Sequence, residues 1–370
     1  MKKLIAISMM IALVAGAAFA QVEVGAALEL RWRLAEEQGT DPKAIGTATS
    51  LGASKFSFTT VGDEGNVGAR LTFDIKEVFG RDDQGAPDWK RIYNQAYIWW
   101  QPIDQIKLQF GMDKDGLFNP TGVTRWGYFR GEPGVVEGGE FWSAENYILG
   151  NWDKFSLAIT ITPMDALTIN FGLGLPNVLE NEDVGLAQNQ AKWEDTFKII
   201  QLQVGYNVDG IGQFWATFQG ENAGNKIGLS YHTSSLVEGL DLEVGFAYSL
   251  KETEHAFGQY RLGGSSGFNQ IGIGLGADYN GGDWGVKTRL FMDGFNKMDI
   301  PLWDITPYYD FGFMQFFFTV RITNLMTDAK FIINPYVVKN VGPAQFRAGF
   351  SYNTVGSGSW SLNTGMKFSF

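Results

Sequence analysis

The sequence predicts an all-β protein, a transmembrane antiparallel up-and-down β-barrel of about 18 strands. Three observations support this fold class. Segments of about ten residues with alternating apolar and polar positions recur along the chain, aromatic residues stand near their ends, and short turns alternate with longer connections. Successive side chains of a strand point to opposite faces, so each segment offers one face to lipid and the other to water.

The alternation is clearest in the segments at 22–34 and 66–76. In VEVGAALELRWRL the apolar residues occupy one parity, whereas two glutamates and two arginines occupy the other, and NVGARLTFDIK repeats this pattern. The same pattern recurs at 105–112, 240–251, 270–279, 284–293 and 344–352. No run of about 18 consecutive apolar residues follows position 21, which excludes a helical membrane protein.

This pattern and the turn residues together predict the strand positions. The predicted strands are 22–34, 51–60, 66–76, 90–101, 105–112, 153–162, 166–175, 196–206, 212–220, 225–233, 239–251, 267–279, 284–293, 304–310, 313–322, 330–339, 343–352 and 359–370. Gly, Pro, Asn and Asp mark the short turns, and most connections after odd-numbered strands are longer. Two of these strands lie in a region rich in aromatic residues, where a tight turn at 310–312 must be inferred between them. If short elements such as these are assigned differently, the alternative is a barrel of about 16 strands.

Aromatic residues of the apolar parity favour a membrane barrel over a soluble β-sandwich, which would also show alternation. In transmembrane barrels, aromatic residues form girdles at the two membrane interfaces, near the strand ends. The aromatic residues in such positions are Trp32, Trp100, Phe110, Tyr206, Tyr279, Trp284, Tyr352, Trp360 and Phe370.

Residues 1–20 have the pattern of a secretory signal peptide, with two lysines, an apolar stretch and the small-residue site AFA before Gln21. A membrane-anchor helix is the alternative, disfavoured because the apolar run is short. Cleavage would leave 21–370 as a single barrel domain. Without the two lysines, 29 − 2 = 27 basic residues stand against 40 acidic ones, so no nucleic-acid partner is expected.

The chain ends in SLNTGMKFSF, a strand whose apolar parity finishes on Phe370. Pairing of this strand with the first would close the barrel and remove the edges that lipid does not tolerate. The signal peptide, the strand rhythm and this ending resemble Gram-negative outer-membrane β-barrel porins, in which the terminal aromatic belongs to the signal read by the barrel assembly machinery. The resemblance implies an outer-membrane location, outer-membrane lipids and that machinery as partners, and a homotrimer as one assembly.

The strand number determines what the interior holds, because barrels of about 16 to 18 strands leave an aqueous channel. Charged residues of the polar parity should line it, since an Arg or Lys facing the bilayer midplane costs about 2–4 kcal/mol. The predicted pore-wall cations are Arg70, Arg91, Lys107, Arg289, Arg321 and Arg347. The simpler interpretation is that each of them only hydrates the lumen.

The connection at 113–152 follows the fifth predicted strand and carries many aromatic residues, more apolar surface than water should cover. In trimeric porins the third extracellular loop, at the same place, folds inward and narrows the pore, and GGEF at 138–141 resembles a cluster in that loop. A lid packed on neighbouring loops is the alternative. The resemblance implies that this loop forms the pore constriction with Glu132, Glu137, Glu140, Arg125 and Arg130.

Catalytic motifs are weak in this sequence. Ser230 and His232 share a face but stand about 6–7 Å apart along a strand, too far for a nucleophile and its base. IGIGLGAD lacks the dinucleotide-binding spacing, and DKDG at 113–116 lacks the later acidic ligands of a calcium loop. We therefore expect no enzyme, no cofactor and no metal site.

Three functions remain open at this point. The first is an outer-membrane porin that forms a water-filled channel for passive diffusion of small hydrophilic solutes and ions. The second is a substrate-specific, sugar-type channel, because Tyr93, Tyr97 and Trp99 share the inward parity and could stack on sugar rings. The third is a surface adhesin or structural barrel.

Overall fold

The computed structural model describes the strands and most of the short turns between Gln21 and Ser369. The described residues are 21–38, 41–43, 48–51, 55–62, 64–74, 93–113, 156–174, 200–220, 226–250, 271–293, 299–323, 325, 329–354 and 358–369. The predicted signal peptide at 1–20 and Phe370 lie outside these residues. Within them, no helix has the length and apolar character needed to cross a membrane.

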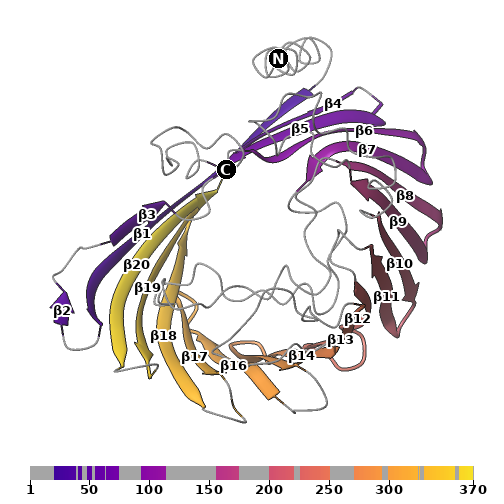
Figure 1. Cartoon of the computed structure of the whole chain (residues 1–370). Helices are drawn as coiled ribbons and strands as arrows, with labels where there is room; N and C mark the ends of the chain where they lie inside the picture. Colours follow the sequence, from indigo (N-terminus) through magenta and orange to yellow (C-terminus); the bar gives the residue numbers. More distant parts are fainter. Residues whose placement is uncertain are drawn as a thin grey trace, which may run out of the picture.

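The described residues form twenty β-strands, and every strand pair is antiparallel (Figure 1). The strands are β1 (Gln21–Gln38), β2 (Asp41–Lys43), β3 (Ala48–Leu51), β4 (Lys55–Val61), β5 (Val67–Asp74), β6 (Tyr93–Ile103), β7 (Ile106–Asp113), β8 (Ser156–Met164), β9 (Leu167–Gly174), β10 (Ile200–Val208), β11 (Gly212–Gln219), β12 (Lys226–Thr233), β13 (Leu240–Ser249), β14 (Ile271–Asn280), β15 (Trp284–Asp293), β16 (Asp299–Asp310), β17 (Gln315–Thr323), β18 (Lys330–Val341), β19 (Ala344–Asn353) and β20 (Ser359–Ser369).

Strand β1 closes the barrel. Its first part, 21–27, pairs with β4, and its later part, 27–38, pairs with β20. From β4 to β20 each strand pairs with the next one along the chain, and among the described residues the short strands β2 and β3 pair with β1. Eighteen of the twenty strands therefore form a closed antiparallel ring, which confirms the predicted fold class and excludes the alternative of 16 strands.

The strand predicted at 51–60 is divided into β3 and β4. Leu51 lies opposite Leu30 of β1, whereas Lys55 lies opposite Ala27. The residues between these two strands, 52–54, lie outside the described residues.

The region rich in aromatic residues forms two strands, β16 and β17, as predicted. The turn between them is held by hydrogen bonds from the Phe311 amide to the Met314 carbonyl, 2.9 Å, and from the Gly312 amide to Asp310 Oδ1, 2.7 Å. Gly312 has a φ of 81°, a left-handed conformation that glycine adopts without steric cost. Strand β16 begins at Asp299, earlier than the predicted 304.

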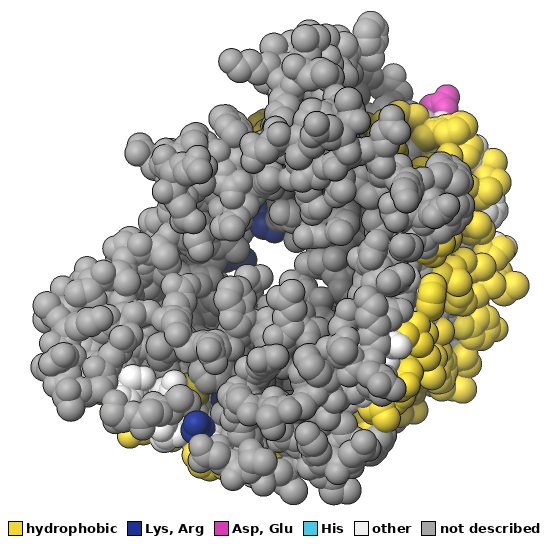
Figure 2. All heavy atoms as spheres, in the orientation of Figure 1, with side chains coloured by type: hydrophobic (Ala, Val, Ile, Leu, Met, Phe, Trp, Pro, Cys, Tyr) yellow, Lys and Arg dark blue, Asp and Glu magenta, His cyan; other side chains and the backbone are white. Residues whose placement is uncertain are grey.

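The two faces of the barrel wall differ in polarity. Large apolar side chains of alternate residues are exposed on the outer face, and Figure 2 shows them gathered over the side where β6 to β9 lie. Polar side chains of the opposite parity line the inner face and bond across strands. Asn170 donates to Gln203, 3.1 Å, and the hydroxyls of Thr306 and Thr319 are 2.9 Å apart. The barrel thus places its apolar surface outward and its hydrogen-bonding groups inward.

Aromatic rings of the inner face cover glycines of the neighbouring strand. Trp99 lies over Gly68, and Trp215 lies over Gly205, so that a Cβ at either glycine would collide with the indole ring. Tyr308 covers Gly285 in the same way. Because glycine has no side chain, each ring can lie flat against the wall and cover the backbone of the glycine. Aromatic residues cover strand glycines in this way in other β-sheets.

We predict that Gly205→Ala lowers the free energy of unfolding by about 1–2 kcal/mol, because overpacking displaces the Trp215 ring. Gly62→Ala is the matched control, since a Cβ there meets no atom closer than 3.6 Å. Urea unfolding in lipid vesicles measures both. The double variant Trp215→Ala, Gly205→Ala gives the control. If its loss of unfolding free energy equals the sum of the losses of the two single variants, the ring and the glycine are not coupled, and the prediction is wrong.

Candidate functional site

The inner face of the barrel is the candidate site, because it is where the predicted pore-wall cations lie. Figure 2 shows basic side chains at the central opening. The cations placed by the structure are Arg70 on β5, Lys107 on β7, Arg289 on β15, Arg321 on β17 and Arg347 on β19. Arg91 lies outside the described residues, as do the predicted constriction residues Glu132, Glu137, Glu140, Arg125 and Arg130.

Arg321 is part of a buried ion pair. It lies directly opposite Asp304 of β16, and its Nε and Nη2 atoms donate to the two carboxylate oxygens at 2.6 and 2.7 Å. Both residues are only 3% exposed. Two parallel hydrogen bonds fix the planes of both groups, and the carboxylate compensates the charge of the guanidinium where it is removed from water.

The charge of Arg289 is also compensated by a carboxylate, but this pair is more accessible to solvent. It donates two hydrogen bonds to Asp278 of β14, and the side chains are 19% and 31% exposed. Arg347 donates from Nε to Gln345 Oε1 at 2.7 Å. The wall cations on β15 and β17 therefore act as pairs with wall carboxylates rather than as isolated positive charges.

Two other wall cations lie beside aromatic rings, in a group that we call the Trp99 cluster: Arg70, Tyr97, Trp99 and Lys107. Tyr97 lies opposite Arg70, and its ring centroid is 6.0 Å from that of Trp99. Lys107 Nζ lies 5.4 Å from the Trp99 ring centroid, within the range of a cation–π interaction. The nearby Arg70 Nε is buried and has no hydrogen-bond partner among the described residues.

The Trp99 cluster was only partly predicted from the sequence. Parity indicated that each of its residues faces inward, but parity gives no information on which positions of different strands are neighbours. The pairing of β5 with β6 and of β6 with β7 brings the two cations to the two aromatic rings. The cluster can hold a flat solute against the indole ring and offer positive charge to an anionic group on it.

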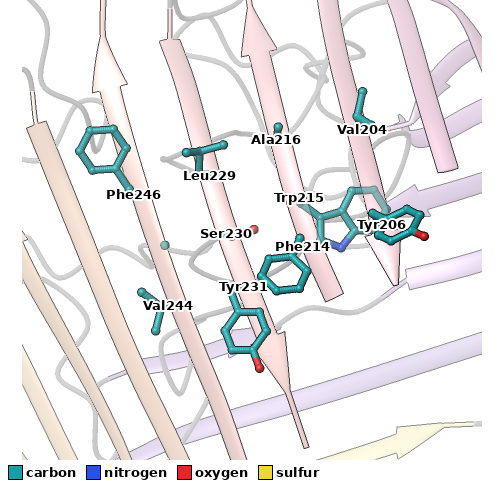
Figure 3. A pocket seen from close by; sticks show the side chains of 11 residues that line it. Val204, Tyr206, Phe214, Trp215, Ala216, Leu229, Ser230, Tyr231, Val244 and Phe246 are labelled. Carbon is teal, nitrogen blue, oxygen red and sulfur yellow. The ribbon is translucent and has the colours of Figure 1, made fainter. Parts of the chain in front are cut away.

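A groove of about 440 Å³ lies on the outer face over β10 to β13 (Figure 3). Tyr206, Phe214, Leu229, Tyr231 and Phe246 contribute to its lining, and Ala216 leaves space between the larger side chains. The Tyr231 hydroxyl donates to the Ile211 carbonyl at 2.8 Å, so it is not directed at a ligand. The groove is almost entirely apolar and belongs to the outer surface.

Comparison with known proteins gives structural likeness only. No protein-family model matches the sequence, and no curated protein sequence matches it. Similar solved structures include a triple mutant of the Rhodopseudomonas blastica porin, with 11% identity over 95% of this chain and 100% of that chain and a TM-score of 0.48.

Another similar structure is a loop-deletion mutant of OmpT, an outer-membrane protein of Vibrio cholerae, with 13% identity over 95% of this chain and 99% of that chain and a TM-score of 0.47. The assignment of this protein as a closed antiparallel β-barrel therefore rests on its own ring of strands and on the polarity of its two faces.

We predict that Asp304→Ala lowers the free energy of unfolding by about 3–5 kcal/mol, because it leaves the Arg321 guanidinium buried without its carboxylate. Asp278→Ala is the matched comparison and should lower the free energy of unfolding by clearly less, since the Arg289 side chain is 19% exposed and can reach water. Urea unfolding of both variants in lipid vesicles tests this order. Equal losses would show that burial does not set the cost of breaking these pairs.

Proposed function

We propose that this protein is an outer-membrane porin that forms a water-filled channel for passive diffusion of small hydrophilic solutes and ions. The observation that carries the proposal is the closed ring of eighteen strands with an apolar outer face and a polar inner face. Barrels of this size have an interior too wide for side chains to fill, so water can occupy it. The protein has no enzymatic role in this proposal.

The outer face supports a location in a lipid bilayer. Exposed residues such as Ile98, Leu229 and Val244 would be unfavourable in water but are compatible with acyl chains. We propose that the chain is exported through a cleaved signal peptide at 1–20 and inserted by the barrel assembly machinery, with Phe370 as part of the assembly signal. A homotrimer within the outer membrane is the proposed assembly.

The connection at 113–152 is proposed as the constriction of the channel. The support comes from the sequence, because its aromatic residues need apolar contacts and its glutamates need water or cations. Wall cations such as Arg70 and Lys107 would offer charge compensation for Glu132, Glu137 and Glu140, while Arg125 and Arg130 of the same loop would add positive charge beside them.

Ion conductance of the purified protein in planar lipid bilayers tests the channel and its constriction together. We expect open, ohmic channels, and a larger single-channel conductance after removal of about ten residues around 132–140, because the deletion widens the narrowest cross-section. Glu137→Lys and Glu140→Lys should move the reversal potential in a salt gradient toward anion selectivity.

Absence of conductance from correctly folded wild-type barrels would refute the channel itself. Unchanged conductance and unchanged reversal potential in all three variants would instead show that this loop lies outside the conduction path, while the channel proposal would stand.

A substrate-specific channel is the second candidate function, and the Trp99 cluster favours it. An indole ring and a phenol ring on the inner wall can contact the flat face of a sugar ring, and Arg70 and Lys107 can bind a carboxylate or phosphate on it. The chemical class that fits both features is an anionic sugar.

If the channel is specific, a sugar acid such as glucuronate should block wild-type ion current in a saturable way, and Trp99→Ala should weaken the block about three- to tenfold through loss of the ring contact. Trp215→Ala is the matched control, because Trp215 also covers a glycine on the inner wall. Bilayer current measured against solute concentration gives the affinity. If the solute blocks the current of both variants with equal affinity, or if the block of wild type does not saturate with solute concentration, general diffusion remains the proposed function.

A further inference from the structure

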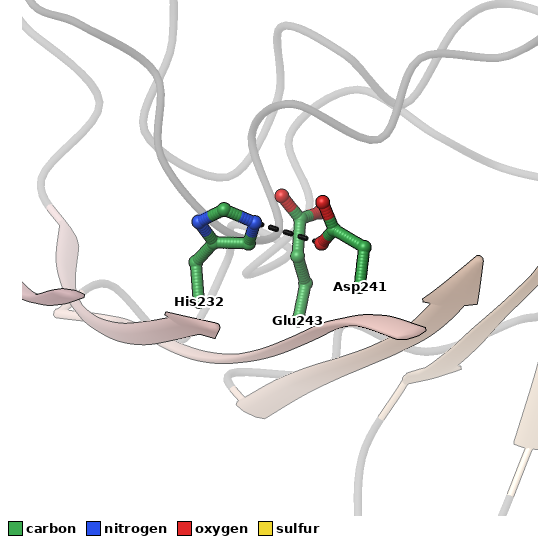
Figure 4. A group of neighbouring side chains, drawn as sticks. All are labelled: His232, Asp241 and Glu243. Carbon is green, nitrogen blue, oxygen red and sulfur yellow. Dashed lines mark hydrogen bonds and ion pairs between the residues drawn. The ribbon is translucent and has the colours of Figure 1, made fainter. Parts of the chain in front are cut away.

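His232 lies in a compact group of metal-ligating side chains on the inner wall. It is one of only two histidines in the sequence. Strand pairing places His232 of β12 directly opposite Glu243 of β13, and Asp241 stands two residues from Glu243 on the same face. Figure 4 shows the imidazole and the two carboxylates directed toward one another. The three potential ligand atoms all lie within 4.8 Å of one another.

The group combines one buried and one accessible carboxylate. Glu243 is 8% exposed, whereas the Asp241 side chain is 48% exposed and the His232 side chain 17%. His232 Nε2 lies 2.7 Å from Asp241 Oδ1, so one of its ring nitrogens points into the group. The turn at 234–239 joins the two strands immediately beyond it, which places the group at the end of the barrel where the short turns lie.

The surroundings of the group are rich in negative charge. Asp241 lies opposite Asp278 of β14, which is itself bonded to Arg289. Three carboxylates therefore converge on neighbouring positions of the wall, with the Arg289 guanidinium bonded to one of them. Carboxylates held close together repel unless a cation lies between them, and a divalent ion offers more compensation than a single proton.

We propose that His232, Asp241 and Glu243 bind a divalent transition-metal ion, with Zn²⁺ as the ion that fits best. Zn²⁺ accepts imidazole nitrogen and carboxylate oxygen at about 2.0–2.2 Å in a tetrahedral arrangement. Ca²⁺ and Mg²⁺ prefer all-oxygen sites with about six or more ligands, which this group does not offer. The nitrogen donor thus selects for zinc and for neighbouring metals of the same series.

Three protein ligands leave the fourth tetrahedral position to water or to a solute in the lumen. The exposure of Asp241 makes the site accessible from the lumen without opening of the wall. Binding replaces the hydrogen bond between His232 and Asp241 by bonds from both groups to the ion, and the neutral imidazole then carries its proton on Nδ1 while Nε2 binds the ion. A bound ion would then change the local wall charge by about two positive units.

Titration calorimetry with ZnCl₂ on the purified, detergent-solubilised barrel tests the site, in an excess of magnesium to saturate oxygen-only sites. We expect one zinc ion per chain, and an affinity at least tenfold lower in each of His232→Gln, Glu243→Gln and Asp241→Asn. Asp241→Asn has the least effect on folding, because its side chain is half exposed. His255→Gln, which changes the other histidine, should bind zinc as wild type does.

Binding of zinc to His232→Gln and Asp241→Asn with wild-type affinity would overturn the proposal, and so would the absence of binding to folded wild-type protein. The assay does not depend on conduction, so a failure here is distinguishable from a failure of the proposed channel function. In planar bilayers, zinc should also move the reversal potential of wild type toward anion selectivity but leave that of Asp241→Asn unchanged.

Discussion

The structure depends on one constraint, the pairing of β1 with β20. In a bilayer no water is present to bond an open strand edge, and each unpaired backbone group costs several kcal/mol. Strand β1 meets this constraint by pairing with two other strands of the ring, with β4 along its first part and with β20 along its later part. The need to reach both neighbours explains the length of β1, Gln21–Gln38, and closes the ring.

A closed ring has only two faces, and lipid and water sort the side chains between them. The Arg–Asp pairs of the described strands lie on the inner face, where the wall compensates part of its own charge. Asp304 neutralises Arg321 in a buried pair, and Asp278 does the same for the more accessible Arg289. In the proposed channel, the wall cations that would act on a solute are therefore Arg70 and Lys107, which lie beside aromatic rings.

Register across neighbouring strands creates the features that could give the proposed channel selectivity. The Trp99 cluster draws its residues from β5, β6 and β7, and the His232 group draws its ligands from β12 and β13. The sequence placed the residues of the Trp99 cluster on the inward parity, but in neither group did it indicate which residues are neighbours. A wall that binds anionic sugars at one place and a metal ion at another would respond to the composition of the solution on either side.

The sequence by itself determined the fold class and the face on which the side chains of the described strands lie, because a period of two is a local property of the backbone, and it left the choice between about 18 and about 16 strands open. It placed β15 at 284–293, as observed, and separated β16 from β17 correctly. Only the tertiary structure decided which residues meet across strands. The pairing of Arg321 with Asp304, the contact of Lys107 with Trp99 and the approach of Asp241 to His232 depend on register and rotamer. A shift of two residues along one strand would keep every polarity pattern intact and would abolish all such contacts of that strand, so no alternation of residues could reveal them.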